Sequence, residues 1–415
     1  MFLGFISVQL AVAGKILPAQ LVYPAVAAAI FLLLHIVMRV FVPGADGLLL
    51  PIAAALTFLG LVMIYRLDSK LAFDQLIWIA VAAACFILVV VFLRKYESLS
   101  QYKYILGLTA VALLLSAMFV GKEVNGARLW LQIGPLHFQP SELAKVLLVI
   151  FLAAFFAEKH ELLTVSTHRV LGVPVPELKY FIPLLLMWGV SVAIMIFQKD
   201  LGSSLLFFGI FVCMVYAATS RKGYVVVGVV LFALGAYLCY LSFSHVQLRF
   251  TTWLHPFNPT TIQNKSYQIS QSLFALSSGG AAGSGLGLGH PNFIPSVTTD
   301  FIFSAVGEEL GLLGASSVVL MYVLMVARGI KVALSHRDDF GKLLAVGLVS
   351  IIAIQSFLIM GGVTRLIPLT GITLPFMSYG GSSLLSNFIL LGLLIVLSHR
   401  GATTNVASIK QGAKR

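Results

Sequence analysis

Asp300 is an acidic residue at a point in the chain where a carboxylate could accept a proton. On a helical period of 3.6 residues, it shares one face with Ser304, Gly307 and Gly311. Such a seam of small residues can line a cavity or pack closely against another helix. An aspartate has a reference pKa of about 3.9, so Asp300 would be ionised at neutral pH and could act as a general base. The plainer alternative is that Asp300 caps the helix that follows it.

Glu142 and Lys145 form a second polar group, inside an apolar run. They are three residues apart, so on a helix they lie on one face and can form an ion pair. Pro140 and Ser141 suit the start of that helix, and Glu142 in the first turn opposes the positive end of the helix dipole. The pair could be a neutralised part of a capped helix, or it could face a substrate cavity.

A glycine-rich run precedes Asp300 in the chain. Glycine lets the backbone approach a ligand and form anion-binding nests, although this spacing matches neither a Walker A loop nor a dinucleotide motif. A flexible loop is the alternative. The glycines of the run are Gly279, Gly280, Gly283, Gly285, Gly287 and Gly289.

Two further segments combine polar, small and rigid residues. Asp200 precedes Gly202 and Ser203, which is typical of an N-cap at the start of a helix. After Arg365, residues 368–383 contain two prolines and a cluster of glycines and serines. This composition is typical of a re-entrant or broken segment, which is tolerated at membrane depth only beside protein or water.

The elements that must position these residues are membrane spans. Hydrophobic residues make up 59% of the 415-residue chain and charged residues 10%, too few charges to cover a water-soluble fold. The net charge of +12 is scattered between apolar runs without a basic stripe, so it indicates membrane-flanking loops and no nucleic-acid-binding surface. Cys85, Cys213 and Cys239 lie in apolar runs without Cys-x-x-Cys spacing, which excludes a disulfide framework and a zinc site.

Twelve apolar runs are candidate spans, for which about 20 residues are needed. The first is too short and lacks the features of a signal peptide, so we expect it to be the remnant of a longer helix. The twelve runs are residues 1–14, 20–42, 48–66, 75–93, 104–120, 141–157, 181–198, 201–220, 223–243, 301–327, 341–362 and 382–398.

The distribution of Lys and Arg predicts the orientation. Connections after even-numbered spans, with the tail, hold 17 of these cations, so we expect both chain ends in the cytoplasm. Connections after odd-numbered spans hold nine: Lys15, Arg66, Lys70, Lys122, Arg128, Lys199, Arg249, Lys265 and Arg365.

Two connections on the predicted outer side, residues 121–140 and 244–299, are longer than ordinary turns. The second contains Trp253 and Phe293 among its glycines and is too apolar for a disordered linker. We expect it to fold back on the membrane surface before the span that begins near Phe301.

In this order, these segments resemble the SEDS family of shape, elongation, division and sporulation proteins, the FtsW/RodA/SpoVE group. The resemblance runs from about residue 48 to residue 400. The motifs that carry it are Asn125-Gly126-Ala127-Arg128-x-Trp130, Gln139-Pro140-Ser141-Glu142-x-Ala144-Lys145, Asp200-Leu201-Gly202, Trp253 with Pro256, Gly285-x-Gly287-x-Gly289, Thr299-Asp300-Phe301-Ile302-Phe303, Glu308-Glu309, Pro368-x-Thr370-Gly371 and Ser378-Tyr379-Gly380-Gly381-Ser382-Ser383.

The resemblance implies an all-α polytopic membrane protein with a ten-helix core at 48–400, about two additional spans at 1–47 and a cytoplasmic tail at 401–415. It implies a peptidoglycan glycosyltransferase that polymerises lipid II at the outer face of the cytoplasmic membrane of a bacterium, in elongation, division or sporulation. The implied partners are lipid II, the growing glycan strand, membrane lipids and a class B penicillin-binding protein that crosslinks the product.

Asp300 is the expected base of a single-step inverting transfer. Among the acids on the outer side it alone combines the seam with a preceding glycine-rich run, and the resemblance points to the same residue. No His, Cys or carboxylate cluster has metal-ligand spacing, so a divalent ion (Mg or Mn) would be held mainly by substrate phosphate and Asp300. The predicted substrate-binding residues are the candidate cations for pyrophosphate, Arg128, Arg249, Lys265 and Arg365, together with Glu142, Lys145, Gly285, Gly287 and Ser378.

Two other functions fit the same residues. A lipid II flippase would use the same cavity and cations without a base, and a non-catalytic scaffold for division or elongation proteins would need neither. Asp300 discriminates between the three, because an enzyme requires its carboxylate, a transporter tolerates Asn and a scaffold is indifferent.

Overall fold

Helices fill most of the structure and follow the apolar runs of the sequence. The computed structural model describes residues 1–93, 95–124, 127–133, 136–164, 168–170, 173–175 and 182–412. Among these residues, ten helices are long and apolar enough to cross a membrane: α2 (Val22–Phe41, preceded by the 3-10 turn η1, Pro18–Leu21), α3 (Leu49–Leu67), α4 (Ser69–Phe92), α6 (Lys103–Val120), α7 (Pro140–Thr164), α9 (Leu201–Thr219), α10 (Lys222–Ser242), α13 (Ile302–Ser335), α14 (Asp339–Val363) and α15 (Gly381–Gly412). Two shorter apolar helices, α1 (Phe2–Ala13) and α8 (Ile182–Phe197), complete the twelve predicted runs.

Short polar residues cap several of these helices. Asp68 Oδ1 accepts from the backbone N–H of Lys70 at 2.8 Å, at the start of α4. Asp200 Oδ1 accepts from the N–H of Ser203 at 3.0 Å, at the start of α9, which confirms the N-cap prediction for Asp200.

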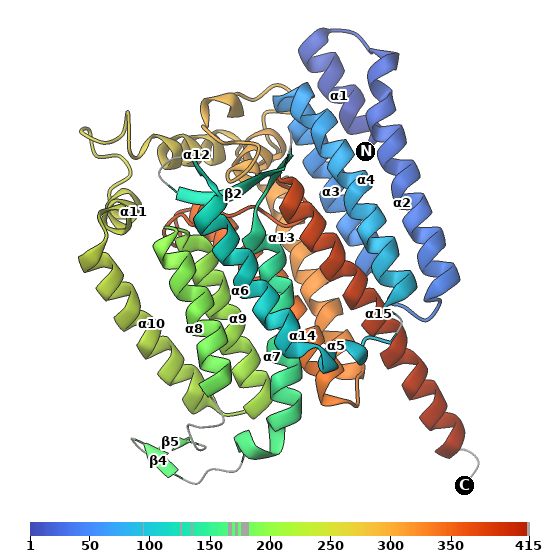
Figure 1. The fold of residues 1–415 in the computed structure, drawn as a ribbon. Coiled ribbons are helices and arrows are strands. Elements are labelled where there is room, and N and C mark those ends of the chain that lie inside the picture. The colour runs from blue at the N-terminus through green and yellow to red at the C-terminus, as the bar shows by residue number, and fades with distance from the viewer. Residues whose placement is uncertain are drawn as a thin grey trace.

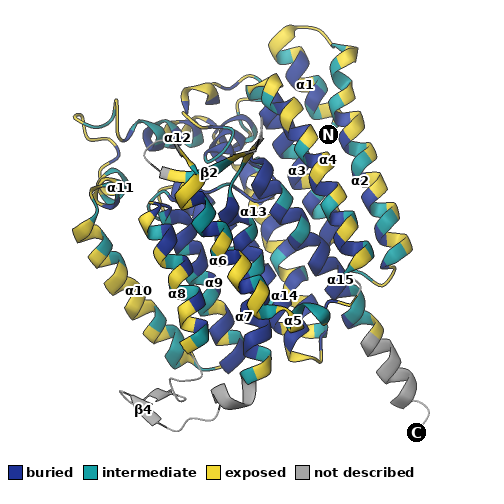
Figure 2. Cartoon of the chain, viewed as in Figure 1, coloured by how far each residue is buried: buried dark blue, intermediate teal, exposed yellow. Residues whose placement is uncertain are grey.

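The centre of the bundle is formed by α7, α14 and α15, and the periphery by helices that expose their apolar side chains. Most residues in the spans of α7 and α15 are buried, whereas none of α10 is buried (Figure 2). An apolar helix with so many exposed side chains suits contact with lipid, since the bilayer core is itself apolar.

The connections gather at the two ends of the bundle (Figure 1). One end, called here the sheet end, carries an antiparallel three-stranded sheet of β1 (Lys122–Val124), β2 (Ala127–Ile133) and β3 (Leu136–Phe138). The other, the tail end, carries the short helix α5 (Ser98–Gln101), the hairpin of β4 (His168–Val170) and β5 (Val173–Val175), and the end of α15. The all-α prediction holds for the spans but missed these strands. Asn125 and Gly126 of the first motif lie outside the described residues, as do four of the 17 cations expected on the cytoplasmic side: Arg94, Lys179, Lys414 and Arg415.

The long connection 244–299 folds onto the sheet end. It forms α11 (Ser244–Leu254), α12 (Tyr267–Ser278) and the 3-10 turn η3 (Pro291–Phe293). The hydroxyl of Ser272, in α12, lies 2.7 Å from the hydroxyl of Ser304 in α13 and donates to the carbonyl of Val363 at 2.9 Å. The loop therefore returns to the bundle, as its apolar residues predict.

Helix α13 breaks at Gly311, which has a φ of 67° and a ψ of −166°. At the break the N–H of Leu312 donates to the carbonyl of Gly280 at 2.9 Å, so the glycine-rich run replaces a bond that a regular helix would make within itself. A Cβ atom on Gly279 would collide with the carbonyl of Gly307. Of the two predicted roles for the seam of small residues in α13, close packing is the one observed at Gly307 and Gly311.

Candidate active site

Asp300 and Arg249 converge on Gly371. Asp300 ends the loop before α13, Arg249 belongs to α11, and Gly371 lies in residues 364–380, the returning segment that joins α14 to α15. A Cβ atom on Gly371 would lie 3.6 Å from Asp300 Oδ2 and 3.7 Å from Arg249 Nη2. Three segments far apart in the sequence thus bring a carboxylate and a guanidinium to one point.

The guanidinium of Arg249 is held by the returning segment. Its Nη1 donates to the carbonyls of Leu369 at 3.0 Å and Thr370 at 2.9 Å. Burial lowers the pKa of Arg249, while the negative charges of Asp200 and Asp300 act in the opposite direction. Since the ordinary pKa of an arginine is above about 12, the group stays charged at neutral pH and provides a fixed cation beside Asp300.

Burial raises the pKa of Asp300 to about 6, although a hydrogen bond from Thr299 and the charge of Arg249 oppose this shift. The carboxyl group is then mainly ionised at neutral pH and still binds a proton readily, which is the range that suits a general base. The N-cap position of α13 is Phe301, and no side chain caps this helix. The alternative that Asp300 is a helix cap is therefore wrong.

The returning segment also positions the residues immediately before Asp300. The hydroxyl of Ser378 donates to the carbonyl of Thr299 at 2.5 Å, and the N–H of Tyr379 donates to the carbonyl of Thr298 at 2.8 Å. Ser378 Oγ in turn accepts from the N–H of Leu374 at 2.9 Å. The structure thus places Ser378, a predicted substrate contact, where it holds the backbone that carries Asp300.

Asp200 is a second carboxylate whose charge, like that of Asp300, acts on Arg249. Asp200 is 7% exposed, and burial raises its pKa. Its Oδ2 and the Oγ1 of Thr370 have no hydrogen-bond partner among the described residues. A Cβ atom on Gly202 would lie 2.5 Å from the carbonyl of Thr370, so the start of α9 lies directly against the returning segment. These polar atoms and Arg249 make the region suitable for a polar ligand.

Glu142 and Lys145 form the predicted ion pair in the interior of the bundle. Lys145 Nζ lies 2.5 Å from Glu142 Oε2 and donates to Gln355 Oε1 at 2.8 Å, while Ser386 Oγ donates to Glu142 Oε2 at 3.1 Å. Lys145 is 2% exposed. Gln355 also donates to the carbonyl of Thr373 at 2.8 Å, so the pair is linked to the returning segment. This geometry confirms the pairing, and a role in substrate binding stays a prediction.

The glycine-rich run wraps around the two glutamates of α13. The N–H of Gly285 donates to the carbonyl of Glu309 at 3.0 Å, and the N–H of Gly287 donates to Glu309 Oε2 at 2.9 Å. The N–H of His290 donates to Glu308 Oε1 at 2.7 Å. The backbone donors of Gly285 and Gly287, which the sequence suggested for a ligand, are thus bonded to α13 in this structure.

The ion pair between Arg66 and Glu309 was not predicted from the sequence. Arg66, at the end of α3, donates from Nε to Glu309 Oε1 at 2.8 Å and from Nη2 to the carbonyl of Gly289 at 2.7 Å. Glu309 is fully buried. Two adjacent acids within one span and a base at the edge of another could have indicated this pair, because charges at membrane depth require partners.

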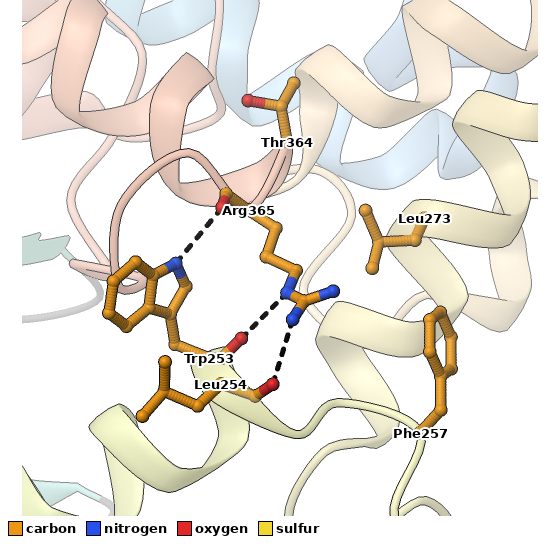
Figure 3. A pocket seen from close by; sticks show the side chains of 6 residues that line it. All are labelled: Trp253, Leu254, Phe257, Leu273, Thr364 and Arg365. Carbon is orange, nitrogen blue, oxygen red and sulfur yellow. Dashed lines mark hydrogen bonds between the residues drawn. The ribbon is translucent and has the colours of Figure 1, made fainter.

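The other predicted cations lie in different surroundings. Arg365 donates from Nε to the carbonyl of Trp253 at 2.8 Å and from Nη2 to that of Leu254 at 2.9 Å, so it joins the returning segment to α11 (Figure 3). It also lines a pocket of about 520 Å³ together with Trp253, Leu254, Phe257, Leu273 and Thr364. Arg128 is exposed on β2, and Lys265 is exposed in the loop between α11 and α12.

No group of three or more His, Cys, Asp or Glu side chains in the described part of the chain could hold a metal ion. The carboxylates nearest the convergence point, Asp300 and Asp200, both act on the charge of Arg249. Hard divalent cations prefer oxygen ligands, which these two carboxylates could supply only in part. A metal would therefore need further ligands from a bound substrate.

These features define a polytopic helical membrane protein in which a partly buried carboxylate and guanidinium meet at one end of the bundle. The family model described as a cell cycle protein, FtsW/RodA/SpoVE, matches residues 46–402. The chain belongs to this family.

Named relatives agree with this assignment. The chain is 47% identical over 380 residues to the peptidoglycan glycosyltransferase RodA of Mycobacterium tuberculosis, which covers 88% of this chain and 80% of the relative. It is 34% identical over 372 residues to the probable peptidoglycan glycosyltransferase FtsW of Geobacter metallireducens, covering 86% of this chain and 95% of that protein.

Solved structures show the same fold. A chain from work on the structural coordination of polymerization and crosslinking by a peptidoglycan synthase complex matches with a TM-score of 0.70 and 27% identity, over 86% of this chain and 98% of that one. The crystal structure of the rod shape determining protein RodA of Thermus thermophilus matches with a TM-score of 0.60 and 28% identity, over 86% and 97% of the two chains.

Proposed function

We propose that this protein is a peptidoglycan glycosyltransferase that polymerises lipid II into glycan strands, with Asp300 as its general base. The observation that supports this most directly is the convergence of Asp300 and Arg249 on Gly371, with the pKa of the carboxyl group at about 6. A proton acceptor and a fixed positive charge at one point are what transfer of a sugar from a pyrophosphate requires.

The reaction is a single inverting displacement. The 4-hydroxyl oxygen of the acceptor sugar forms a bond to the anomeric carbon of the donor, and the bond from that carbon to the pyrophosphate oxygen breaks. Asp300 takes the hydroxyl proton, and the polyprenyl pyrophosphate leaves with both bonding electrons. Arg249 offsets the negative charge of that region, because preorganised cations stabilise charge best where water is excluded.

The remaining predicted substrate contacts have supporting roles in this proposal. Lys145 and Glu142 support the returning segment through Gln355, and Ser378 holds the backbone next to Asp300. Gly285 and Gly287 support the site indirectly, through the conformation of the glycine-rich run that is bonded to Glu309. Arg128, Lys265 and Arg365 are cations at the sheet end that can attract the anionic substrate over a distance. A divalent ion, Mg or Mn, would bind to substrate phosphate and Asp300, where it would neutralise leaving-group charge.

The sheet end faces the outside of the cytoplasmic membrane of a bacterium in this proposal. The 17-to-9 distribution of cations supports that orientation. Residues 48–400 form the catalytic core, residues 1–47 an N-terminal addition and residues 401–415 a cytoplasmic tail. The partner is a class B penicillin-binding protein, which the similarity to a chain of a peptidoglycan synthase complex supports.

Polymerisation by the purified protein tests the proposal. Fluorescent lipid II would be incubated with the protein in detergent, with and without a penicillin-binding partner whose crosslinking activity has been inactivated, and glycan length would be measured on a gel. We expect long strands from the wild type. Transport of lipid II across vesicles without polymerisation would favour a flippase, and neither activity would favour a scaffold.

A further inference from the structure

The N-terminal helix α1 lies outside the family match, which begins at residue 46, and yet it packs directly on the glycine-rich run. A Cβ atom on Gly287 would lie 2.8 Å from Ala11 Cβ, 3.5 Å from Val12 Cγ2 and 3.6 Å from Val8 Cα. Gly287 also has a φ of 84°, which L side chains rarely adopt. At this point the backbone of the loop touches the face of α1 with no side chain of its own between them.

The other side of Gly287 is bonded to α13. Its N–H donates to Glu309 Oε2 at 2.9 Å, and Glu309 is paired with Arg66. Arg66 also binds two later residues of the loop: it donates to the carbonyl of Gly289 at 2.7 Å and to Asn292 Oδ1 at 3.1 Å. The loop at Gly287 is thus confined between α1 and the buried ion pair.

The helical hairpin α1–α2 is fixed to the residue next to Arg66. Gln9 is 2% exposed; its Oε1 accepts from the N–H of Leu17 at 3.0 Å and its Nε2 donates to Tyr65 Oη at 3.4 Å. The hydroxyl of Tyr65 donates to Gln20. Adjacent residues of α3, Tyr65 and Arg66, therefore bind the hairpin and the loop respectively, which links the two through α3.

The α1–α2 hairpin is also bound to the core at the tail end. The carboxylate of Asp46, just after α2, pairs with Arg328 of α13, and the N–H of Asp46 donates to Ser398 Oγ at 2.7 Å. The hairpin is therefore anchored to the core at both ends, as a rigid support requires.

We propose that α1 is a positioning element for residues 279–293 and, through them, for Asp300, with Ala11 as the positioning residue at the contact. Only seven residues separate Asn292 from Asp300, and the buried side chains of Ile294 and Val297 tie them to the core. A displacement at Gly287 is therefore passed along a short, anchored segment to the carboxylate. This inference rests on the proposed function, because it concerns the base of that reaction.

The test enlarges Ala11 and compares it with a matched change on the same helix. Ala11→Leu places three additional carbon atoms against Gly287, whereas Ala13→Leu makes the same substitution at an exposed position. Hydrogen exchange of residues 279–300, followed by mass spectrometry in the full-length protein, is expected to rise in Ala11→Leu and not in Ala13→Leu. The polymerisation rate at saturating lipid II should fall roughly 10- to 100-fold in Ala11→Leu and stay within about twofold in Ala13→Leu, since small misplacements of a catalytic group cost rates of this size.

A second variant covers the case in which Ala11→Leu does not fold. Gln9→Met keeps the volume of the side chain but removes its bonds to Leu17 and Tyr65, and it should raise exchange in residues 279–300 without touching the loop. The proposal is overturned if exchange in that segment is the same in wild type, Gln9→Met and any folded Ala11→Leu protein. It is also overturned if Ala13→Leu has the same effect as Ala11→Leu.

The exchange measurement separates this inference from the proposed function. A wild-type protein that makes no glycan would remove the proposed reaction, and the inference that depends on it, even if exchange in the loop responds as expected. An active wild type whose loop exchange and rate ignore the Ala11 and Gln9 variants would reject the role of α1 alone.

Discussion

The carboxylate of Asp300 and the guanidinium of Arg249 face the same bare position of the backbone, Gly371. Their Oδ2 and Nη2 atoms would lie 3.6 and 3.7 Å from a side chain begun there. Because Gly371 has no side chain, no Cβ atom lies between the two groups at this point. The bonds of Arg249 to the carbonyls of Leu369 and Thr370 keep that arrangement.

Replacing Asp300 with Asn should abolish polymerisation while leaving the fold intact. The amide keeps the size of the side chain but cannot take a proton at neutral pH, so the rate is expected to fall by about 100-fold or more. Glycan length made by the purified variant with its partner measures this. Asp74→Asn, at an exposed acid of α4, is the matched control and should stay within about twofold of the wild type. Long glycan strands from a folded Asp300→Asn protein would remove the base from the mechanism.

The rate should depend on pH through Asp300. With a pKa of about 6, the carboxylate is ionised above that value, so the rate should be level near pH 8 and about tenfold lower at pH 5. Initial rates between pH 5 and pH 8 measure this dependence. The residual activity of Asp300→Asn should lack it, and an unchanged profile in that variant would assign the dependence to another group.

The ionisation of Asp300 should also affect stability: the rate rises with pH, whereas the contribution of this group to stability falls. The folded-state pKa of Asp300 is raised above the ordinary value of 3.8, so the folded protein binds the proton more tightly than the unfolded chain. Stability from this group therefore falls as the pH rises from about 4 to about 6 and stays lower above that. Asp300→Asn should melt no lower than the wild type at pH 7, as measured by thermal denaturation in detergent. A clearly lower melting temperature would indicate a structural role for the carboxylate.

Arg249 should influence the pH below which the polymerisation rate falls. Its positive charge lowers the pKa of Asp300, so Arg249→Gln should move the acid limb of the rate profile upward by about one pH unit. The maximal rate should fall as well, because the cation at the site is lost. Arg128→Gln, at an exposed position on β2, is the control and should leave the limb in place. A limb that does not move in Arg249→Gln would show that the two groups do not interact.

The pair of Glu142 and Lys145 should show strong coupling in a double-mutant cycle. Glu142→Ala leaves a buried, uncompensated lysine and is expected to destabilise by about 3–5 kcal/mol, whereas the double change to Ala should cost less than the sum of the two single changes. Thermal or denaturant unfolding of the four proteins measures this. The partly exposed pair of Lys103 and Glu158 is the control, with an expected coupling of about 0–1 kcal/mol. Additive losses at Glu142 and Lys145 would contradict the pair.

Much of this protein is determined by short stretches of its sequence. A run of about 20 apolar residues must satisfy its backbone within a helix when it crosses a membrane, so all twelve helical runs could be located. Several helices extend beyond the predicted limits into polar sequence: α13 continues to Ser335 and α15 to Gly412, whereas the apolar runs were predicted to end at 327 and 398. The pairing of Glu142 with Lys145 and the capping role of Asp200 could also be predicted, since each depends on groups only three residues apart in the sequence.

The site itself was decided by contacts between distant segments. The sequence offers four cations for Asp300, and only the packing of α11 against the returning segment places Arg249 beside it and directs Arg365 to the carbonyls of α11. Likewise, no local pattern joins Arg66 to Glu309, which are 243 residues apart, or turns the donors of Gly287 toward that glutamate.

The difference has one physical cause. Helix formation and capping depend on bonds between residues near one another in the chain, which composition and spacing determine. The partner of a buried charge depends on which helices lie side by side and at what depth. Many arrangements of the same twelve helices would satisfy the local rules, and only the packed bundle selects the one in which Asp300, Arg249 and Gly371 meet.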